Sequence, residues 1–560
     1  MYSIFTIQDE IKNGIKQALT KVAGESGIDP VNIHDAELEV PKDRKFGDYA
    51  SNAAMTSAGL FHKNPRELAE LIKSNFPESK YVTSIEVAGP GFINFKLDKA
   101  RLHNVLSEID EMGSDFGNID AGAGRRVQIE FVSANPTGPM HLGNARGGAI
   151  GDVLASILKR AGYYVEKEFY INDAGNQIEK FGVSLEARYL QLFGKESEVP
   201  EEGYHGKDLI ELMKEYTQEY GDSCLNMDSR ERQVMLRKWA LERNIDRMKK
   251  DLNAYGVQYD VWFRESTLHK SGEVADVINL FKKKGYTYES GGALWFKATD
   301  FGCNKDEVLV RANGIPTYFT SDIAYHRNKF IKRGFDTVID IWGADHAGHV
   351  DRMKAAMRAL GIDPGRLNVL IMQLVRLKMG GQFTRMSKRT GNMVTLRDLV
   401  DAVGKDAVRF LFNMRSADSQ FEFDMDLAIK ESNENPVFYV QYAHARICSI
   451  LRNASSIDIK VPDLKDTDLS YLKKDEEYAL LEKLASYPEE IGLAASRLEP
   501  YRITHYATDL ASLFHSFYTE CRVIGVDEQV MKARLLLIDS TRKVLANALG
   551  ILGVNAPQKM

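Results

Sequence analysis

The hydrophobic positions between residues 127 and 158 change from a strand pattern to a helix pattern. Apolar and polar residues alternate over 127–131, which predicts a β-strand. Residues 135–138 (Asn-Pro-Thr-Gly) break the chain, and Pro139 is typical of the first turn of a helix. Apolar residues then recur at helical spacing over 145–158. We therefore expect a strand, a turn and a helix, around which the rest of the chain is arranged.

The predicted helix carries a glycine face and two polar residues at its start. Gly143, Gly147 and Gly151 are four apart, so a planar ligand can approach the backbone closely. His141 and Asn144 can both donate hydrogen bonds at the helix end that favours anions. These features indicate a nucleotide site. The alternative is a glycine face packed against a neighbouring helix, with His141 a satisfied polar residue.

The pattern before this stretch indicates a small α/β domain over residues 1–115. Helical spacing over 4–22 and 66–74 accompanies a strand-like run over 92–97. We expect Phe92 and Phe95 in this run to pack in the domain rather than to form a platform for nucleic-acid bases. The Ala-Gly-Ala-Gly segment at 121–124 indicates a linker.

Strand and helix signals alternate over residues 120–430, which predicts a doubly wound, mainly parallel α/β sheet of Rossmann-like type. Ligands of such sheets bind at the carboxyl ends of the strands. A charged, helical insertion is expected at about 175–310, including a long helix over 229–255. The remaining expected strands are 163–171, 294–296, 308–310, 317–319, 337–342 and 368–377, with a helix over 350–360.

Residues 433–560 show only helical periodicity and predict an all-α bundle, with helices over 437–452, 476–485, 503–518 and 531–549. The first of these helices interleaves aromatic and basic residues. Tyr439, Tyr442 and Arg446 are candidates for stacking on unpaired RNA bases, although half or more of the aromatic side chains in the bundle must be core.

The composition changes this picture little. The chain has 560 residues, of which 44% are hydrophobic and 27% charged, as in soluble globular proteins. The net charge of -6 is not the overall positive charge that is typical of nucleic-acid-binding proteins, so any RNA binding must come from local basic patches. The four cysteines are far apart and predict neither disulfides nor a structural zinc site. With no long apolar run and no leader pattern, we expect a cytoplasmic protein without membrane association.

A second chemically informative stretch lies at residues 385–392. Arg385, Lys388 and Arg389 surround Met386 and Ser387, which is a composition suited to a polyphosphate and its leaving group. A solvated surface loop is the alternative. A nucleotide-receiving helix early in a parallel sheet and a basic loop after its last strand together indicate adenylate-forming chemistry.

At this point a resemblance to the class I aminoacyl-tRNA synthetases, and among them the arginyl-tRNA synthetases, accounts for both stretches. His141-Leu142-Gly143-Asn144 resembles the motif His-Ile-Gly-His, and Met386-Ser387-Lys388 resembles the core of Lys-Met-Ser-Lys-Ser. The departures are Asn144, Arg385 and Arg389. The arginyl resemblance rests on residues 130–139, 46–49 (Phe-Gly-Asp-Tyr), 442–446 (Tyr-Ala-His-Ala-Arg) and the ending 552–560, and covers essentially the whole chain.

The resemblance implies roles for individual residues. Catalytic roles fall to His141, Asn144 and Lys388. The ATP-binding residues would be His141, Gly143, Asn144, Gly147, Asp345, Met386, Ser387 and Lys388. The arginine-binding residues would be Glu130, Ser133, Asn135, Tyr318, Asp322 and His346. Tyr318 and Asp322 are four apart, so on a helical turn they share one face, where a ring can stack and a carboxylate can fork onto a guanidinium. A helix cap is the alternative for Asp322.

The resemblance also implies the reaction and its partners. We expect an ATP-dependent, AMP-forming arginine–tRNA ligase, with L-arginine, ATP and tRNA(Arg) as partners, Mg²⁺ accompanying ATP, and a monomeric chain. The N-terminal domain would contact the tRNA elbow and the bundle would read the anticodon. We disfavour a metal site at Asp345, His346 and His349, because three ligands on one short loop without cysteines are a weak signal. Other class I synthetases, a smaller nucleotidyltransferase and a non-catalytic tRNA-binding relative are the competing hypotheses.

Overall fold

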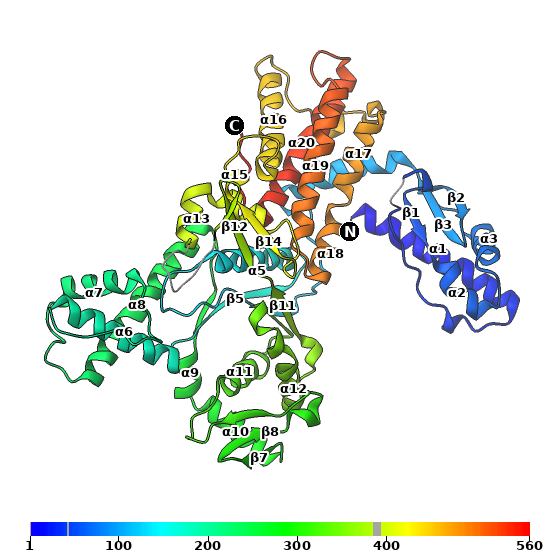
Figure 1. Cartoon of the computed structure of the whole chain (residues 1–560). Helices are drawn as coiled ribbons and strands as arrows, with labels where there is room; N and C mark the ends of the chain where they lie inside the picture. The colour runs from blue at the N-terminus through cyan, green and yellow to red at the C-terminus, as the bar shows by residue number, and fades with distance from the viewer. Residues whose placement is uncertain (1, 42–43, 385–393) are drawn as a thin grey trace.

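The computed structural model describes residues 2–41, 44–384 and 394–560. The N-terminal part stands to one side of the molecule (Figure 1). It contains a three-stranded antiparallel sheet in the order β1-β3-β2, and the apolar stripe of its first helix is buried in a core of its own. Its elements are α1 (Ser3–Ser26), β1 (Tyr49–Ser51), α2 (Ala53–Phe61), α3 (Pro65–Asn75), β2 (Val82–Ala88) and β3 (Phe92–Leu97), followed by the linking helices η3 (Lys99–His103) and α4 (Asn104–Met112).

The central domain is built on a five-stranded sheet whose neighbouring strands are all parallel, in the order β11-β10-β4-β5-β6. This arrangement confirms the predicted doubly wound class. Helix α5 (Leu142–Arg160) lies between this sheet and the bundle (Figure 1), and nearly all of its residues are buried. The strands are β4 (Arg126–Glu130), β5 (Tyr164–Ile171), β6 (Val261–Arg264), β10 (Thr337–Gly343) and β11 (Leu367–Met372).

Two groups of elements extend from this sheet between residues 175 and 337. The first is a set of three helices, α6 (Asn176–Leu192), α7 (Lys207–Tyr220) and α8 (Ser229–Tyr255), with a separate apolar core. The second places a small antiparallel sheet in the order β7-β8-β9 beneath the helices that lead back to β10. It contains α9 (Glu265–Lys270), α10 (Glu273–Lys283), β7 (Thr287–Ser290), β8 (Ala293–Phe296), β9 (Glu307–Val310) and α11 (Tyr318–Arg327), which continues as a π-helix over Asn328–Lys332.

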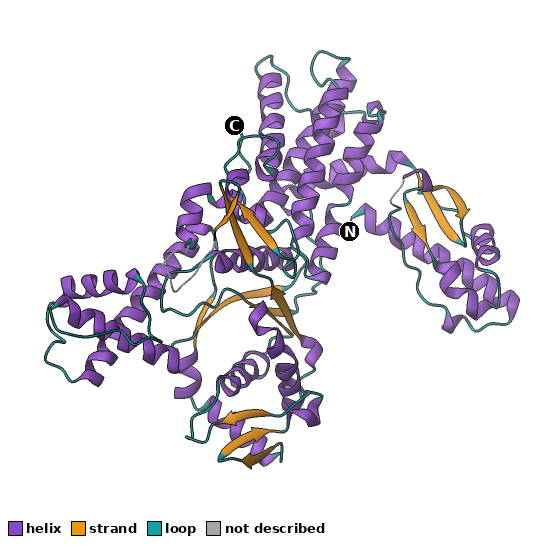
Figure 2. Cartoon of the chain, in the orientation of Figure 1, coloured by secondary structure: helices purple, strands orange, loops and turns teal. Residues whose placement is uncertain are grey.

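After β10 the chain runs through η7 (Ala344–His349), α12 (Val350–Leu360) and β11 into a further small sheet in the order β13-β12-β14. Its strands are β12 (Val375–Met379), β13 (Gln382–Thr384) and β14 (Phe421–Asp424), with α13 (Leu396–Val403), α14 (Lys405–Phe412) and α15 (Met425–Ala428) beside them. The C-terminal part is wholly helical, as predicted (Figure 2). Its helices are α16 (Pro436–Ser455), α17 (Asp475–Ala485), α18 (Tyr487–Arg497), α19 (Tyr501–Glu520) and α20 (Glu528–Leu552).

Several expected elements differ from the structure. The run at 317–319 was expected as a strand, but α11 begins at Tyr318, because a three-residue apolar run does not distinguish a strand from a helix start. The single run expected over 368–377 is two strands, β11 and β12, which belong to different sheets. Helix α5 starts at Leu142, so Pro139 lies before it. The interval 175–310, expected to be helical, also contributes β6 to the central sheet.

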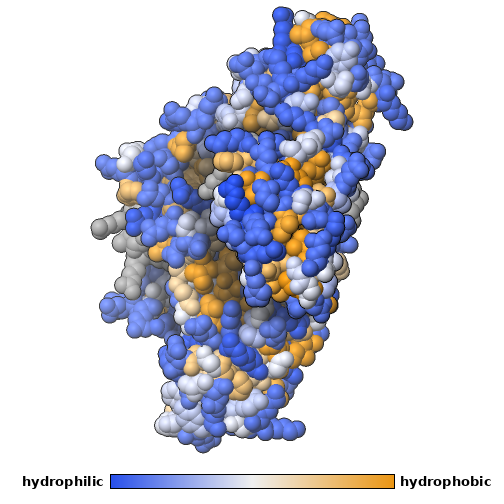
Figure 3. Space-filling model, turned by 90° about the vertical axis from the view of Figure 1, so that its right-hand side faces the viewer, coloured by the Kyte–Doolittle hydropathy of each residue, from blue (hydrophilic) through white to orange (hydrophobic). Residues whose placement is uncertain are grey.

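Seen from the side of the N-terminal part, the surface is mainly hydrophilic with smaller apolar patches (Figure 3). Phe95 is fully buried in the N-terminal core, which agrees with strand packing at this position. Within the described ranges, no helix is long and apolar enough to cross a membrane.

Candidate active site

The carboxyl ends of β4 and β10 form the centre of the site. From β4 the sheet continues to β5 on one side and to β10 on the other, so the chain reverses direction across the sheet between β4 and β10. Ligands of doubly wound sheets bind at such a reversal point. Glu130 is the last residue of β4, and residues 131–144 lead from it to the start of α5.

The turn directly after β4 has a strained backbone. Val132 and Ser133 have φ angles of 69° and 39°, in the left-handed region that β-branched residues rarely adopt, and the Ser133 N–H donates to the Phe131 carbonyl. Such strain costs about 1–3 kcal/mol per residue and clusters at functional sites. Here it turns the Ser133 hydroxyl back to donate to Oε1 of Glu130 at 2.9 Å, while Oγ of Ser133 accepts from the Tyr170 N–H at 3.1 Å.

Glu130 is buried in a network of charged groups. Its Oε2 accepts a hydrogen bond of 2.7 Å from Nζ of Lys329, which also donates to Asp340 at 2.9 Å. Burial raises the pKa of Glu130, since Asp340 shares the ammonium group that would otherwise favour ionisation. For Asp340, burial opposes ionisation, but Lys329 and His326 outweigh it and lower its pKa to about 2. Glu130 is therefore held rigidly by protein partners at the edge of the site.

His141 and Asn144 form a reciprocal cap at the start of α5. Nδ1 of His141 accepts from the Gly143 N–H at 3.1 Å, and Oδ1 of Asn144 accepts from the His141 N–H at 2.9 Å. Because Nδ1 is an acceptor here, a neutral His141 ring carries its proton on Nε2. Asn144 thus has a structural role at the start of the helix. A cap of this kind stabilises a helix by about 1 kcal/mol.

The three glycines of α5 have different surroundings. A Cβ on Gly143 would lie 3.1 Å from the His141 ring, so this glycine lets the ring sit close to the helix. Gly147 is buried beneath Met372 at the end of β11. At Gly151 a Cβ would lie 2.2 Å from Phe131, so that position packs against the residue that directly follows β4. The glycine face therefore serves close packing along most of its length rather than one continuous ligand surface.

Met386, Ser387 and Lys388 lie outside the described residues. The described chain resumes at Val394. Thr395 pairs with His141 in an isolated β-bridge, and the Leu396 N–H donates to the Met140 carbonyl at 2.9 Å. Thr395 and Leu396, at the start of α13, are thereby tied to the residues directly before α5.

Tyr318 and Asp322 begin helix α11, where their spacing places them on one face. Oδ2 of Asp322 is 2.7 Å from Nε2 of His349, and Arg352 donates to the Tyr318 hydroxyl at 3.1 Å. Since Arg352 also donates to Nδ1 of His349, the proton of a neutral His349 ring lies on Nε2 and is donated to Asp322. Tyr318 is 58% exposed, so its ring can receive a ligand.

Glu265 is a functional candidate that the sequence did not reveal. It begins α9 at the end of β6 and is 8% exposed, and it hydrogen-bonds Ser321 and Tyr170. Burial and the nearby Asp322 raise its pKa to about 7. A buried carboxylate whose ionisation is opposed by a second acidic group makes a site that a cation would stabilise. The sequence signal for Glu265 was a Glu-Ser pair directly after a short strand. Such pairs are too common to predict a functional site.

The remaining expected site residues lie on the outer rim. Asp345 and His346 are on η7, with side chains 81% and 58% exposed and 3.6 Å between their charged atoms. Asn135 is half-buried and donates to Gln177 of α6. These side chains are open to solvent and are not fixed in the core as Glu130 is.

The whole chain matches known proteins in three consecutive parts. Residues 9–97 match the family model described as the arginyl tRNA synthetase N terminal domain, residues 106–432 the catalytic domain of tRNA synthetases class I (R), and residues 440–560 the DALR anticodon binding domain. The arginine–tRNA ligase of Caldanaerobacter subterraneus subsp. tengcongensis is 58% identical over 554 residues, covering 99% of each chain. That of Acetivibrio thermocellus is 53% identical over 558 residues, again covering 99% of each.

The chain belongs to the arginyl-tRNA synthetase family. A solved structure of a putative arginyl tRNA synthetase from Campylobacter jejuni is similar, with a TM-score of 0.76, 31% identity, and coverage of 83% of this chain and 100% of the other. The Thermus thermophilus arginyl-tRNA synthetase, at 23% identity and a TM-score of 0.76 over 98% of this chain and 100% of the other, shares the fold.

In this synthetase the aromatic and basic side chains of α16 contact one another. Arg446 lies over the ring of Tyr518, 4.2 Å from its centroid, and donates to the Tyr442 hydroxyl at 2.6 Å. Tyr439 packs against His515 with 4.8 Å between ring centroids. All three expected tRNA-binding residues are half-buried, so part of each side chain stabilises the bundle and part reaches the surface.

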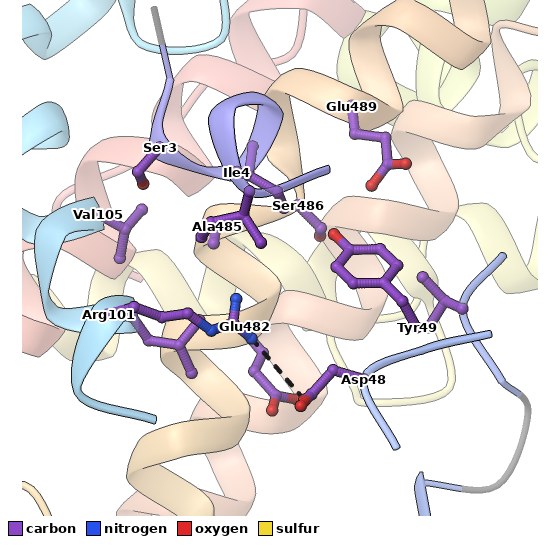
Figure 4. Close-up of a pocket in the computed structure, with 13 residues that line it drawn as sticks. Ser3, Ile4, Asp48, Tyr49, Arg101, Val105, Glu482, Ala485, Ser486 and Glu489 are labelled. Atoms are coloured by element: carbon purple, nitrogen blue, oxygen red, sulfur yellow. Dashed lines mark ion pairs between the residues drawn. The ribbon is translucent and has the colours of Figure 1, made fainter. Parts of the chain in front are cut away.

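The Phe-Gly-Asp-Tyr stretch at 46–49 lies where the N-terminal part of the synthetase meets its bundle. Asp48 and Tyr49 line a cavity of about 60 Å³ together with Arg101, Glu482 and Glu489 (Figure 4). Asp48 is 3.9 Å from Arg101 and accepts from the Leu97 N–H at 2.7 Å.

A single amide bridges the two parts across this cavity. Nε2 of Gln8 donates to the Tyr49 hydroxyl at 3.1 Å and to Oε1 of Glu489 on α18 at 3.0 Å. Gly47 has a φ of 110°, and a Cβ there would lie 2.7 Å from the Phe95 carbonyl oxygen, so only glycine fits. The stretch that carries part of the family resemblance thus joins the N-terminal part to the bundle.

Proposed function

We infer that this synthetase is an arginine–tRNA ligase that activates L-arginine with ATP and transfers it to the 3′ end of tRNA(Arg). An oxygen of the arginine carboxylate attacks the α-phosphorus of ATP, the bond to the β-phosphate oxygen breaks, and pyrophosphate leaves. A hydroxyl of the 3′-terminal adenosine then attacks the arginyl carbonyl, and AMP leaves. Membership of the family and the relatives named arginine–tRNA ligase support this activity.

The observation that carries the substrate assignment is the pair of carboxylates at Asp322 and Glu265. Both lie beside the carboxyl ends of the strands, and burial together with the nearby Asp322 raises the pKa of Glu265 to about 7. A guanidinium is planar, permanently charged and able to bind two carboxylates through paired donors. We propose that it lies between these two groups, with Tyr318 stacked against it.

This arrangement would select arginine without a second, hydrolytic site. An ionised, buried carboxylate left without its cation costs about 3–5 kcal/mol, a penalty that a neutral amino acid would incur on entering the pocket. We assign the polar groups of arginine to the strand side of the site, where Glu130 and Ser133 are held in fixed positions and Asn135 and His346 lie at the rim. The carboxylate of Glu130 would contact the substrate while it stays hydrogen-bonded to Lys329 and Ser133.

Activation depends on positioning and charge stabilisation, and no covalent intermediate with the protein is needed. We propose that His141 donates from Nε2 to the reacting phosphate or the ribose, with Gly143 and Gly147 giving the nucleotide close access to the first turns of α5. Asn144 would act by fixing the His141 backbone. Asp345 would contact the adenosine, and Met386, Ser387 and Lys388 the phosphates.

We propose that Mg²⁺ arrives with ATP. This ion is held mainly by substrate phosphates and water, with one or two carboxylates. Among the described residues, no group of three or more candidate ligands lies together. When bound, the ion would neutralise phosphate charge.

For tRNA we propose that residues 433–560 bind the anticodon through Tyr439, Tyr442 and Arg446, and that residues 1–115 contact the elbow, with residues 120–430 performing catalysis. The test of the function is amino-acid-dependent exchange of labelled pyrophosphate into ATP, measured with each amino acid, with and without tRNA(Arg). We expect exchange with arginine alone among the amino acids. If another amino acid supports exchange and arginine does not, or if none does in the presence of tRNA, the proposal fails.

A further inference from the structure

Arg146, five residues after His141 on α5, is completely buried, and its partners are main-chain carbonyl groups. Nη1 donates to the Gln373 carbonyl at 2.9 Å. Nη2 donates to the carbonyls of Ser416 at 2.9 Å and Ser419 at 3.0 Å. The guanidinium also lies over the Phe421 ring, 5.4 Å from its centroid.

These acceptors lie in the two segments that precede β12 and β14 of the small sheet β13-β12-β14. Gln373 lies in the crossing from β11 to β12, and residues 416–419 form a turn shortly before β14. The Gln373 N–H donates to the Ala417 carbonyl at 3.0 Å, and β12 pairs in parallel with β14. One guanidinium therefore joins α5 to both segments that enter this sheet.

A buried cation in this place needs an explanation. Burial lowers the pKa of Arg146 to about 10, and the attraction of Asp418 opposes this effect only in part. Taking a charge out of water is unfavourable, and an apolar side chain could fill the same volume without that cost. The planar fork of arginine, however, places two separate nitrogens on the carbonyls of two segments from one helical position, whereas lysine would have to reach both segments from a single nitrogen.

Residues near Arg146 contact the same region of the molecule. Gly147 lies beneath Met372, the residue before Gln373. On the other side, Thr395 and Leu396 pair with His141 and Met140. The start of α5 and the residues directly before it thus contact the β11–β12 connection and the start of α13. These contacts fix the position of the nucleotide-facing end of α5 relative to both segments.

We propose that Arg146 is a positioning residue for the activation step, because it holds the β12–β14 sheet in a fixed orientation relative to His141. This inference rests on the proposed function. It predicts that weakening the clamp misplaces His141, the proposed donor to the reacting phosphate, relative to this sheet. The arginine pocket on α11 and α9 should be unaffected, since no described contact of Arg146 reaches those helices.

The test compares Arg146→Lys with Arg534→Lys in the full chain. Arg534 is also buried, donates to the Arg522 carbonyl at 2.6 Å and to Glu477 at 2.7 Å, and lies within the bundle. Both variants lose a buried fork, so both should melt at a lower temperature. At a temperature where both are folded, arginine-dependent pyrophosphate exchange should have a kcat lowered roughly 10- to 100-fold in Arg146→Lys, as misplacement of about 1 Å can produce.

In that variant the arginine KM should stay within about twofold of the parent, because its pocket is unchanged. Arg534→Lys should exchange at the parental rate. An unaltered kcat in Arg146→Lys, or an arginine KM that rises as much as kcat falls, overturns the inference. If Arg146→Lys does not fold, Phe421→Leu, which removes the facing ring and keeps the guanidinium, should lower kcat in the same selective way, and a parental rate there overturns it too. Loss of exchange in the parent protein would instead contradict the proposed function.

Discussion

Oδ2 of Asp322 lies 2.7 Å from Nε2 of His349, so a histidine from η7 fixes the orientation of a carboxylate on α11. Arg352, one turn further along, orients the histidine and also reaches the Tyr318 hydroxyl. Asp322 and Tyr318, two of the three proposed guanidinium contacts, are thus held by one set of hydrogen bonds. Disturbing this set should affect arginine before it affects ATP.

We expect Asp322→Asn to lower kcat/KM for arginine by about 100-fold or more, since the lost charge pair is worth about 3 kcal/mol or more. The KM for ATP should change by no more than about twofold. Steady-state pyrophosphate exchange with each substrate varied in turn measures both. Equal effects on arginine and ATP would point to a purely structural role for Asp322. His349→Gln, which keeps a donor near the carboxylate, should have a smaller effect in the same direction.

The pH dependence of arginine binding should report on Glu265, whose pKa burial and Asp322 raise to about 7. Binding a guanidinium requires the ionised carboxylate, which is lost as the pH falls through this value. The arginine KM should therefore rise roughly tenfold per unit of pH below about 7. The KM for ATP, measured over the same range, serves as the control.

Glu265→Gln should give a higher arginine KM that no longer depends on pH between about 6 and 8. Its stability gives an independent check. The folded pKa is raised above the unfolded value of 4.5, so ionisation costs stability as the pH rises from there towards about 7. The free energy of unfolding of Glu265→Gln minus that of the parent should therefore be larger at pH 8 than at pH 5. A pH-dependent KM that persists in this variant would assign the titration to another group.

Gly151→Ala should destabilise the protein by about 1–3 kcal/mol through overpacking, because its Cβ would lie 2.2 Å from the fully buried Phe131. The control is Gly59→Ala on α2, where nothing lies within 4 Å of the added Cβ. That change should stabilise its helix by about 0.5–1 kcal/mol. Denaturant unfolding compares the two. A neutral Gly151→Ala would show that α5 can move away from β4, contrary to the close packing described above.

Because of Glu489, the N-terminal part should dock less tightly on the bundle as the pH rises. Burial raises the pKa of its carboxyl group, so stability present at low pH is lost as the pH rises through the folded value. Glu489→Gln keeps an acceptor for Gln8 and should dock at least as well as the parent at neutral pH. Glu489→Ala loses the bond of 3.0 Å from Gln8.

Limited proteolysis of the link at Lys99–His103 measures this docking. Cleavage should be fastest in Glu489→Ala, and the parent should become more sensitive between pH 5 and 8 while Glu489→Gln does not. Equal cleavage of all three proteins would show that the Gln8 bridge does not contribute to docking.

Local patterns along the chain were sufficient for most elements. The predicted helices over residues 229–255 and 350–360 match α8 (Ser229–Tyr255) and α12 (Val350–Leu360) at both ends, because a strong periodicity is closed by Gly256 and Gly361 in left-handed caps. The parallel sheet followed from strands alternating with helices, and the family from motifs at fixed spacing. Each of these signals is carried by residues close together in the sequence.

Only the tertiary structure decided which side chains meet. Glu265 and Asp322 are brought together by separate elements, and the start of α11 at Tyr318 depends on packing that a short apolar run does not specify. The partners of Arg146 are carbonyl groups, which every residue has, so no sequence pattern distinguishes them. The sequence by itself determined the elements and the chemistry available, whereas the fold determined the distances, because those depend on how the strands order in the sheet.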